Sequence, residues 1–179
     1  MESDEKLLEQ ARCGDEASFT RLFRHRQGAV YRFALHMWGD EGMAEDVTQE
    51  TFLALLNHGH RFDASRGTLL SFLFGIARNL VLRRIEKQRP ETAVEDFAGE
   101  DNLLDDLTRR ETIEQVRRAV LSLPAVYREA VVLCDLEGVS YQDAAVVLEC
   151  PVGTVRSRLS RGRIMLGQKL GAAILRSVS

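Results

Sequence analysis

Apolar residues recur at intervals of three and four along most of the chain. This spacing places them on one face of a helix, whereas a half-buried strand would show strict alternation. Three helices are predicted in the first half, over about 19–37, 42–56 and 69–89. Their inward faces are expected to carry Phe19, Leu22, Phe23, Val30, Phe33, Ala34 and Met37, then Met43, Val47, Thr51, Ala54 and Leu55, then Leu69, Leu73, Ile76, Ala77 and Leu80.

A second set of helices is predicted after a stretch that lacks this rhythm. Residues 90–106 are acidic and poorly periodic, and Pro90 disfavours helix in the residue before it, so we expect a linker there. Further helices are expected over 113–121 and 125–136, followed by two short helices separated by Glu149, Cys150 and Pro151. The predicted fold is all-α, with two small helical domains, 1–89 and 107–179, joined by an acidic linker.

Charge is distributed unevenly over the 179 residues, although the net charge is only −3. Residues 1–90 are neutral overall, residues 91–116 hold nine acidic and two basic residues, and residues 117–179 hold nine basic and five acidic residues. The three segments therefore have different electrostatic tasks, and the basic end is suited to a polyanion.

The basic end contains a pattern typical of a helix-turn-helix. Ser140 can cap one helix, and Pro151 fits the first turn of the next, where its missing N–H costs nothing. On that second helix an apolar side is formed by Val155, Leu159, Gly162 and Leu166, and the opposite side carries Arg156, Ser157, Ser160 and Arg161. An apolar back with a basic, hydroxyl-bearing front is what entry into the major groove of DNA requires.

Arginine can grip guanine through two parallel hydrogen bonds, and Arg156 and Arg161 are the candidates for that contact. An ordinary solvated cationic helix face is the alternative, but no acidic residue follows position 149 to pair with these arginines. The other candidates are Ser157 and Ser160 for bases or phosphates, Arg158 and Arg163 for phosphates, and Thr154 at the anion-attracting N-terminus of the helix.

Three motifs resemble those of the extracytoplasmic-function group of bacterial sigma factors. EGVSY at 137–141 with CPVGTVRSRL at 150–159 resembles the promoter-recognition domain, DVTQETF at 46–52 resembles the polymerase-binding helix, and FLFGIARN at 72–79 resembles the promoter-melting helix. The motifs follow in the right order and cover most of residues 15–170. The resemblance implies a non-enzymatic factor that recruits RNA polymerase to promoter DNA.

The polymerase-binding face is expected on the helix at 42–56, opposite its apolar side. An exposed leucine among polar groups is unusual for a merely solvated face, although an ordinary acidic surface is the alternative. By resemblance this face docks on a coiled coil of the clamp of the largest polymerase subunit. Its residues are Asp46, Gln49, Glu50 and Leu53.

The melting site is expected at the loop 58–67 and the helix after it. By resemblance the loop forms a pocket for a flipped base of the downstream promoter element, Asn79 reads a base edge, and nearby arginines hold phosphates. Aromatic side chains can stack on unpaired bases, but Phe72 and Phe74 flank the apolar stripe and fit the core equally well. The candidates are Phe62, Arg66, Phe72, Arg78, Asn79 and Arg83.

Other functions fit the sequence less well. A stand-alone DNA-binding regulator would share the helix-turn-helix, but no ligand-binding or phosphoryl-acceptor domain is evident, and a structural helical adaptor would leave the basic end unexplained. No phosphate-cradling glycine loop or nucleophile motif is found, and His58 and His60 lack a third ligand, so we expect no enzyme, metal or cofactor. Cys13, Cys134 and Cys150 lack CxxC spacing and are expected to be small buried hydrophobic residues.

The expected partners are core RNA polymerase, promoter DNA in duplex and single-stranded form, and, by resemblance, an anti-sigma factor that clamps the two domains together until a stress releases them. The acidic linker fits either a basic polymerase channel or a solvated spacer. No apolar run of eighteen residues occurs and the N-terminus is acidic, so we expect a cytoplasmic protein without membrane insertion.

Overall fold

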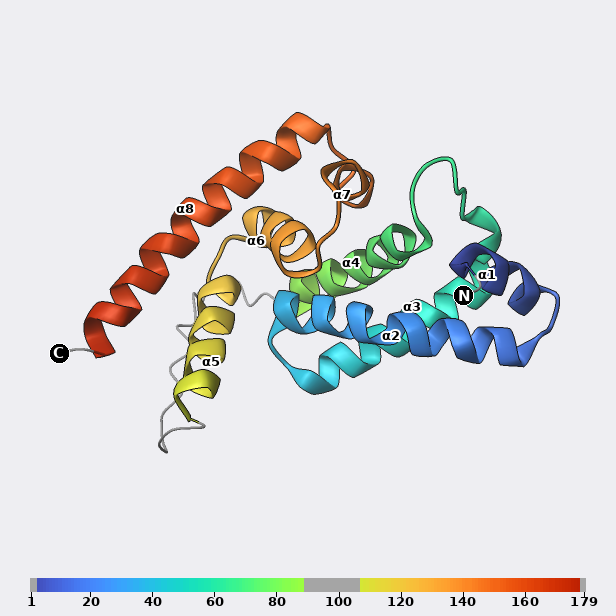
Figure 1. The fold of residues 1–179 in the computed structure, drawn as a ribbon, viewed down its shortest axis with the longest axis horizontal. Coiled ribbons are helices and arrows are strands. Elements are labelled where there is room, and N and C mark those ends of the chain that lie inside the picture. Colours follow the sequence, from blue (N-terminus) through green and yellow to red (C-terminus); the bar gives the residue numbers. More distant parts are fainter. Residues whose placement is uncertain (1–2, 89–106, 178–179) are drawn as a thin grey trace.

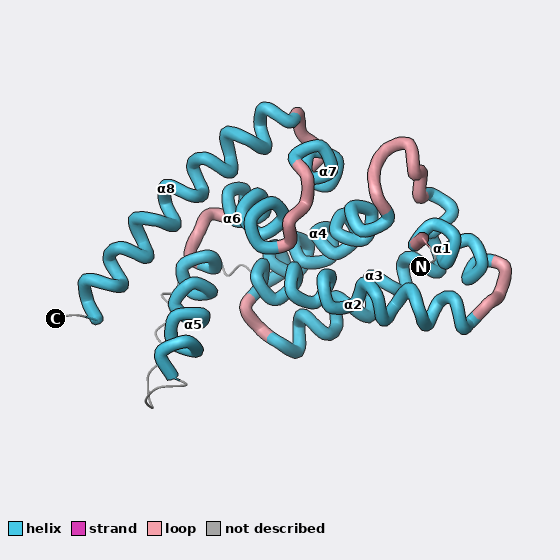
Figure 2. Tube along the Cα trace, in the orientation of Figure 1, coloured by secondary structure: helices cyan, strands magenta, loops and turns pink. Residues whose placement is uncertain are grey.

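The computed structural model describes residues 3–88 and 107–177, so the predicted linker at 90–106 lies outside the described residues. Every regular element in the described part is a helix (Figure 1, Figure 2), which confirms the all-α class. The first half contains α1 (Asp4–Arg12), α2 (Glu16–Trp38), α3 (Glu41–His58), the 3-10 helix η1 (Gly59–Arg61) and α4 (Leu69–Gln88). The second half contains α5 (Leu107–Leu121), α6 (Ala125–Val131), the π-helical segment η2 (Val132–Leu136), α7 (Tyr141–Val147) and α8 (Val152–Ser177).

Short polar side chains begin several of these helices. Asp15, Asp40 and Ser140 each accept a hydrogen bond from a backbone N–H two or three residues further on. Such a cap satisfies a donor that the first turn of a helix leaves unpaired. Ser140 is the cap predicted from the sequence, and the helix that it begins is α7. At the other end of α2 the chain turns at Gly39, which has a left-handed φ of 95° that a side chain would disfavour.

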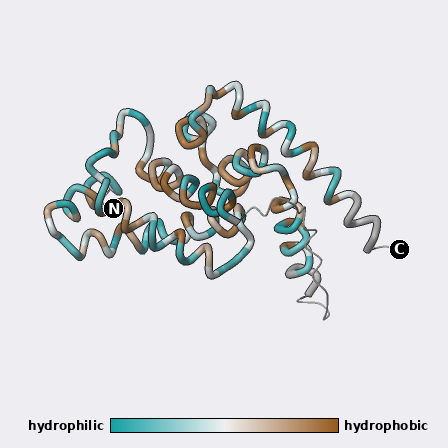
Figure 3. The backbone as a smooth tube through the Cα atoms, turned by 180° about the vertical axis from the view of Figure 1, so that it is seen from behind, coloured by the Kyte–Doolittle hydropathy of each residue, from teal (hydrophilic) through white to brown (hydrophobic). Residues whose placement is uncertain are grey.

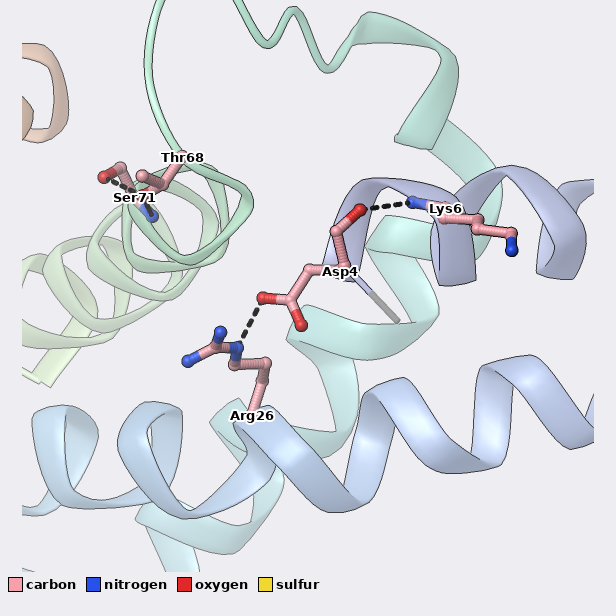
Figure 4. A network of polar contacts seen from close by, with 6 residues as sticks. Asp4, Lys6, Arg26, Thr68 and Ser71 are labelled. Atoms are coloured by element: carbon pink, nitrogen blue, oxygen red, sulfur yellow. Dashed lines mark hydrogen bonds and ion pairs between the residues drawn. The ribbon is translucent and has the colours of Figure 1, made fainter. Parts of the chain in front are cut away.

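Helix α2 is the centre of the first half and packs against α1, α3 and α4. The Phe33 and Phe74 rings meet between α2 and α4 with centroids 5.3 Å apart. Helix α1, which the apolar spacing did not predict, is held by the Arg26 Nε, which donates to Asp4 at 2.5 Å (Figure 4). The three helices predicted over 19–37, 42–56 and 69–89 are confirmed as α2, α3 and α4.

Helix α8 runs along one side of the molecule, against α5, α6 and α7 (Figure 1). Its backbone lies so close to α6 that a Cβ atom at Gly162 would come within 2.7 Å of Val131 Cγ2. The prediction of two short helices at this end is wrong, because α7 is short but α8 is 26 residues long. The glycines within α8 have low helix propensity, but packing against three neighbouring helices stabilises α8 across them. The helix predicted over 125–136 is confirmed as α6 followed by η2.

The two halves pack against each other, with α4 on α7 and with α2 on α5, α6 and η2. Their buried apolar residues form one cluster, and Figure 3 shows hydrophobic residues gathered in the middle of the molecule. Arg128 Nη1 donates to the Met37 carbonyl at 2.6 Å, and Arg117 Nη2 donates to the Gly39 carbonyl at 2.5 Å. Two cations of the second half thus bind the carbonyl end of α2, where the helix dipole favours positive charge.

The cysteines do not all behave as small buried hydrophobic residues. Cys134 and Cys150 are half-buried and pack against the core, but Cys13 is exposed. The prediction is therefore wrong for Cys13, which is the C-terminal cap of α1 and follows the last turn of that helix onto the surface.

Candidate nucleic-acid and polymerase interfaces

The first turns of α8 have the two faces that the sequence predicts. Val155, Leu159 and Gly162 are buried against the preceding helices. The opposite face, formed by Arg156, Ser157, Ser160 and Arg161, is exposed. Because helix α8 is anchored by its apolar back, these polar side chains are presented to solvent on a rigid element, which suits the reading of base edges in a groove.

One arginine of α8 has an acidic partner, contrary to the expectation that none of them would be paired. Arg163 Nη2 lies 2.6 Å from Asp135 Oδ1, so η2 supplies an acidic partner from earlier in the chain. The Arg156 guanidinium carbon lies 5.9 Å from the centroid of the Tyr141 ring. Thr154 and Arg158 are half-buried. Arg163 is exposed as well, but Arg156 and Arg161 are the exposed arginines of α8 for which the described residues provide no acidic partner.

The polymerase-binding candidates share one exposed face of α3. Asp46, Gln49 and Glu50 are exposed, and the Leu53 side chain lies among them with 58% of its surface accessible. Leu56, which is 49% exposed and one turn further on, extends the apolar part of this face, and its spacing from Leu53 is the signal that could have revealed it.

Glu50 is not free of partners within the chain. Its Oε1 lies 2.5 Å from Arg84 Nη2 on α4, and both side chains remain partly exposed. A cationic partner on another protein would therefore compete with Arg84 for this carboxylate. Because the Arg84 side chain is only 22% exposed, loss of this pair would leave a largely buried cation without its carboxylate, so the exchange has a cost.

Four of the six melting-site candidates gather around a pocket of about 290 Å³ at the start of α4. Phe62, Arg66, Phe72 and Asn79 all line it. The rings of Phe62 and Phe72 are 5.7 Å apart and tilted by 60°. The structure brings these four predicted residues together from the loop and the helix, so an aromatic pair, a cation and an amide line the same pocket.

Burial settles the question left open for the two phenylalanines. Phe74 is fully buried in the core, so it cannot serve as a stacking platform in this arrangement. Phe72 is half-buried and borders the pocket.

At the start of α4 the hydroxyls of Thr68 and Ser71 lie 2.7 Å apart, and Thr68 Oγ1 accepts from the Ser71 N–H at 3.2 Å (Figure 4).

The opposite wall of the pocket comes from the second half of the protein. Val146, Val147 and Glu149, on α7 and the turn after it, line the same cavity. These residues could not be predicted from the sequence, since no local pattern places α7 on α4. Glu149 also has a φ of 50°, the left-handed conformation that favours glycine.

Arg78 is held away from solvent by the second half. Its Nε donates to Glu129 Oε1 at 3.0 Å and its Nη2 to Glu129 Oε2 at 3.3 Å, and the two side chains are only 16% and 3% exposed. Arg83, by contrast, is exposed on α4. In this packing, Arg83 can meet a phosphate directly, whereas Arg78 can do so only after α4 and α6 separate.

Two titratable groups respond to the contact between the halves. Burial, and then the positive charges of Arg117 and Arg32, lowers the pKa of His36 on α2. Burial raises the pKa of Glu137, while the hydrogen bond from Arg32 opposes this change. The Arg32–Glu137 ion pair, 3.0 Å long, joins α2 to the segment just after η2.

No group of three metal-ligating side chains occurs in 3–88 or 107–177. The His58 and His60 rings lie 6.3 Å apart without such a third ligand. None of the helices in these ranges is long and apolar enough to cross a membrane.

Two family models match the chain, Sigma-70 region 2 over residues 22–91 and Sigma-70, region 4 over residues 113–166. The ECF RNA polymerase sigma factor SigE of Mycolicibacterium smegmatis is 37% identical over an alignment of 163 residues that covers 86% of this chain and 63% of that relative, so the chain spans just under two thirds of its length. The probable RNA polymerase sigma-C factor of Mycobacterium bovis is 37% identical over an alignment of 153 residues that covers 84% of this chain and 82% of that relative.

A solved structure resembles the whole arrangement. The sigma factor RpoE from Bartonella quintana, in complex with the anti-sigma factor NepR, aligns with a TM-score of 0.70 and 27% identity over 86% of this chain and 96% of that chain. The fold, the two matched regions and the identity to these relatives agree. The chain belongs to the extracytoplasmic-function group of bacterial RNA polymerase sigma factors, which are transcription initiation factors and not enzymes.

Proposed function

We propose that this sigma factor directs promoter-specific initiation through three surfaces, each on a different helix. The α3 face around Leu53 binds the clamp of core RNA polymerase, the front of α8 reads duplex DNA of the upstream element, and the pocket at the start of α4 takes the opened strand of the downstream element. The observation that carries the proposal is the α8 face, where Arg156 and Arg161 stand exposed on a helix whose back is buried.

The pocket at the start of α4 has the chemistry that an extruded base needs. Phe62 and Phe72 offer aromatic surface, and Asn79 offers both a donor and an acceptor for a base edge. Arg66 and Arg83 supply charge for the adjoining phosphates, with Arg78 joining them once its contact with Glu129 opens. Stacking on aromatic side chains is worth roughly 1–3 kcal/mol per base, which opposes restacking without any consumption of ATP.

The two halves, 1–89 and 107–179, act as separate domains in this proposal, with 90–106 as the link between them. The packing of α4 on α7 and of Arg78 on Glu129 supports the idea that the packed arrangement is a resting state, because it covers one wall of the pocket. By analogy with the RpoE–NepR complex, we propose that an anti-sigma factor holds this resting state. The protein then works in the cytoplasm, where core polymerase is found.

In vitro transcription with purified core polymerase and a library of genomic promoter fragments tests this proposal. The expected result is transcription from a subset of fragments that share two sequence elements, with no transcription from core polymerase alone. A parallel mobility-shift assay with the sigma factor by itself separates this function from that of a stand-alone regulator, which would bind duplex DNA without polymerase. Failure to join core polymerase, or joining without starting RNA, would overturn the proposal.

A further inference from the structure

Tyr141 lies beside an arginine of the exposed front of α8. It is the first residue of α7, and its half-buried ring packs against the core. The Arg156 guanidinium carbon stands 5.9 Å from the ring centroid. Further along α8, the hydrogen bonds with Asp135 raise the pKa of Arg163. The Tyr141 ring therefore stands within cation–π distance of Arg156, while Arg163 is paired with a carboxylate.

Arg156 and Arg163 occupy the same side of α8 because the seven residues between their positions make almost two helical turns. Arg163 is also fixed from η2, since Asp135 accepts from its Nε at 3.0 Å and from its Nη2 at 2.6 Å. The Asp135 carboxylate thus holds Arg163 against η2, and the Tyr141 ring of α7 lies beside Arg156. Arg156 is the arginine that we assign to base reading.

A free arginine side chain samples many rotamers, and this freedom is lost when its guanidinium grips a guanine edge. An aromatic ring beside the guanidinium restricts the side chain beforehand and attracts its charge. The ring can do so without touching DNA, because it acts through the arginine. Pre-organisation of this kind improves recognition at the one base that the arginine reads and leaves other contacts unchanged.

We propose that Tyr141 is a positioning residue that orients Arg156 for reading a base of the upstream promoter element. The inference rests on the proposed function of α8 and adds a residue outside the recognition helix to its specificity. Two other roles are possible for a half-buried tyrosine next to DNA, a direct contact with phosphate through its hydroxyl and a purely structural role under α8. The experiment below separates all three roles.

The test uses holoenzyme assembled from core polymerase and full-length sigma factor, with a promoter library randomised in the upstream element. Arg156→Ala first identifies the position whose base preference it abolishes. Tyr141→Leu is then expected to reduce discrimination at that same position about two- to fivefold and to leave other positions unchanged. Tyr141→Phe, which keeps the ring, should retain the preference. In an Arg156→Ala background, Tyr141→Leu should have no further effect.

The controls keep the outcomes distinct. Tyr127→Leu on α6 measures the effect of losing another half-buried tyrosine below α8. Thermal unfolding of each variant reports on folding. If Tyr141→Leu fails to fold, Tyr141→Met replaces it. A loss of promoter activity that is uniform over all sequences, and as large in Tyr141→Phe as in Tyr141→Leu, would show a phosphate contact. That result would overturn the proposal. An effect that persists without Arg156, or no positional effect of Arg156→Ala, would also overturn it. Wild-type holoenzyme without any promoter preference would instead refute the proposed function.

Discussion

The ion pair between Arg78 and Glu129 joins α4 of the first half to α6 of the second. Glu129 is almost completely buried, and its two carboxylate oxygens accept from two nitrogens of Arg78. In Arg78→Leu the carboxylate would remain buried without a partner, which typically costs roughly 3–5 kcal/mol. Because the partners lie on opposite sides of the contact, separation of the halves would relieve this cost. The equilibrium should therefore shift toward separated halves by about two orders of magnitude or more.

Small-angle X-ray scattering measures this shift as an increase in the radius of gyration. Arg78→Leu with Glu129→Leu is the matched control, because replacing both members of a buried pair with apolar residues of similar size is often neutral, so that the double variant should stay compact. Asp135→Asn, which removes an exposed pair with Arg163 within the second half, should leave the radius unchanged. An Arg78→Leu protein that is as compact and as stable as the wild type would refute the argument that this pair joins the halves.

Three further predictions follow from single sites. Glu149→Gly should stabilise the protein by about 0.5–1 kcal/mol in denaturant unfolding, because it removes left-handed strain at a φ of 50°, whereas Glu149→Ala should give no gain. Burial is the first cause of the lowered pKa of His36, so the unfolded chain binds a proton at this histidine more readily than the folded chain does. The stability of the fold should therefore decrease as the pH drops below 6.5. In thermal unfolding at several pH values, His36→Gln should weaken this pH dependence more than His25→Gln does. Gln49→Ala with Leu53→Ala should weaken binding to core polymerase, and an unchanged affinity in a pull-down titration would exclude this face.

Local pattern in the sequence determined the helical class and the faces of individual helices. The exposure of Arg156 and Leu53 and the burial of Val155 follow from a repeat of 3.6 residues, which any isolated helix obeys. The Ser140 cap depends on a bond spanning three residues, and it is also visible in the sequence. Motifs of this length carried the resemblance to the sigma family, so fold class, family and the main candidate surfaces could be predicted.

Only the tertiary structure decided which charges pair and which side of a helix meets another. Arg78 and Glu129 are 51 residues apart and Arg163 and Asp135 are 28 apart, so nothing in their local spacing links them. Phe72 and Phe74 flank the same stripe, and the position of the neighbouring helices buried one and left the other at the pocket. The physical reason is that a helix specifies its own faces through short-range geometry, whereas contacts between helices depend on how all the apolar faces pack together at once.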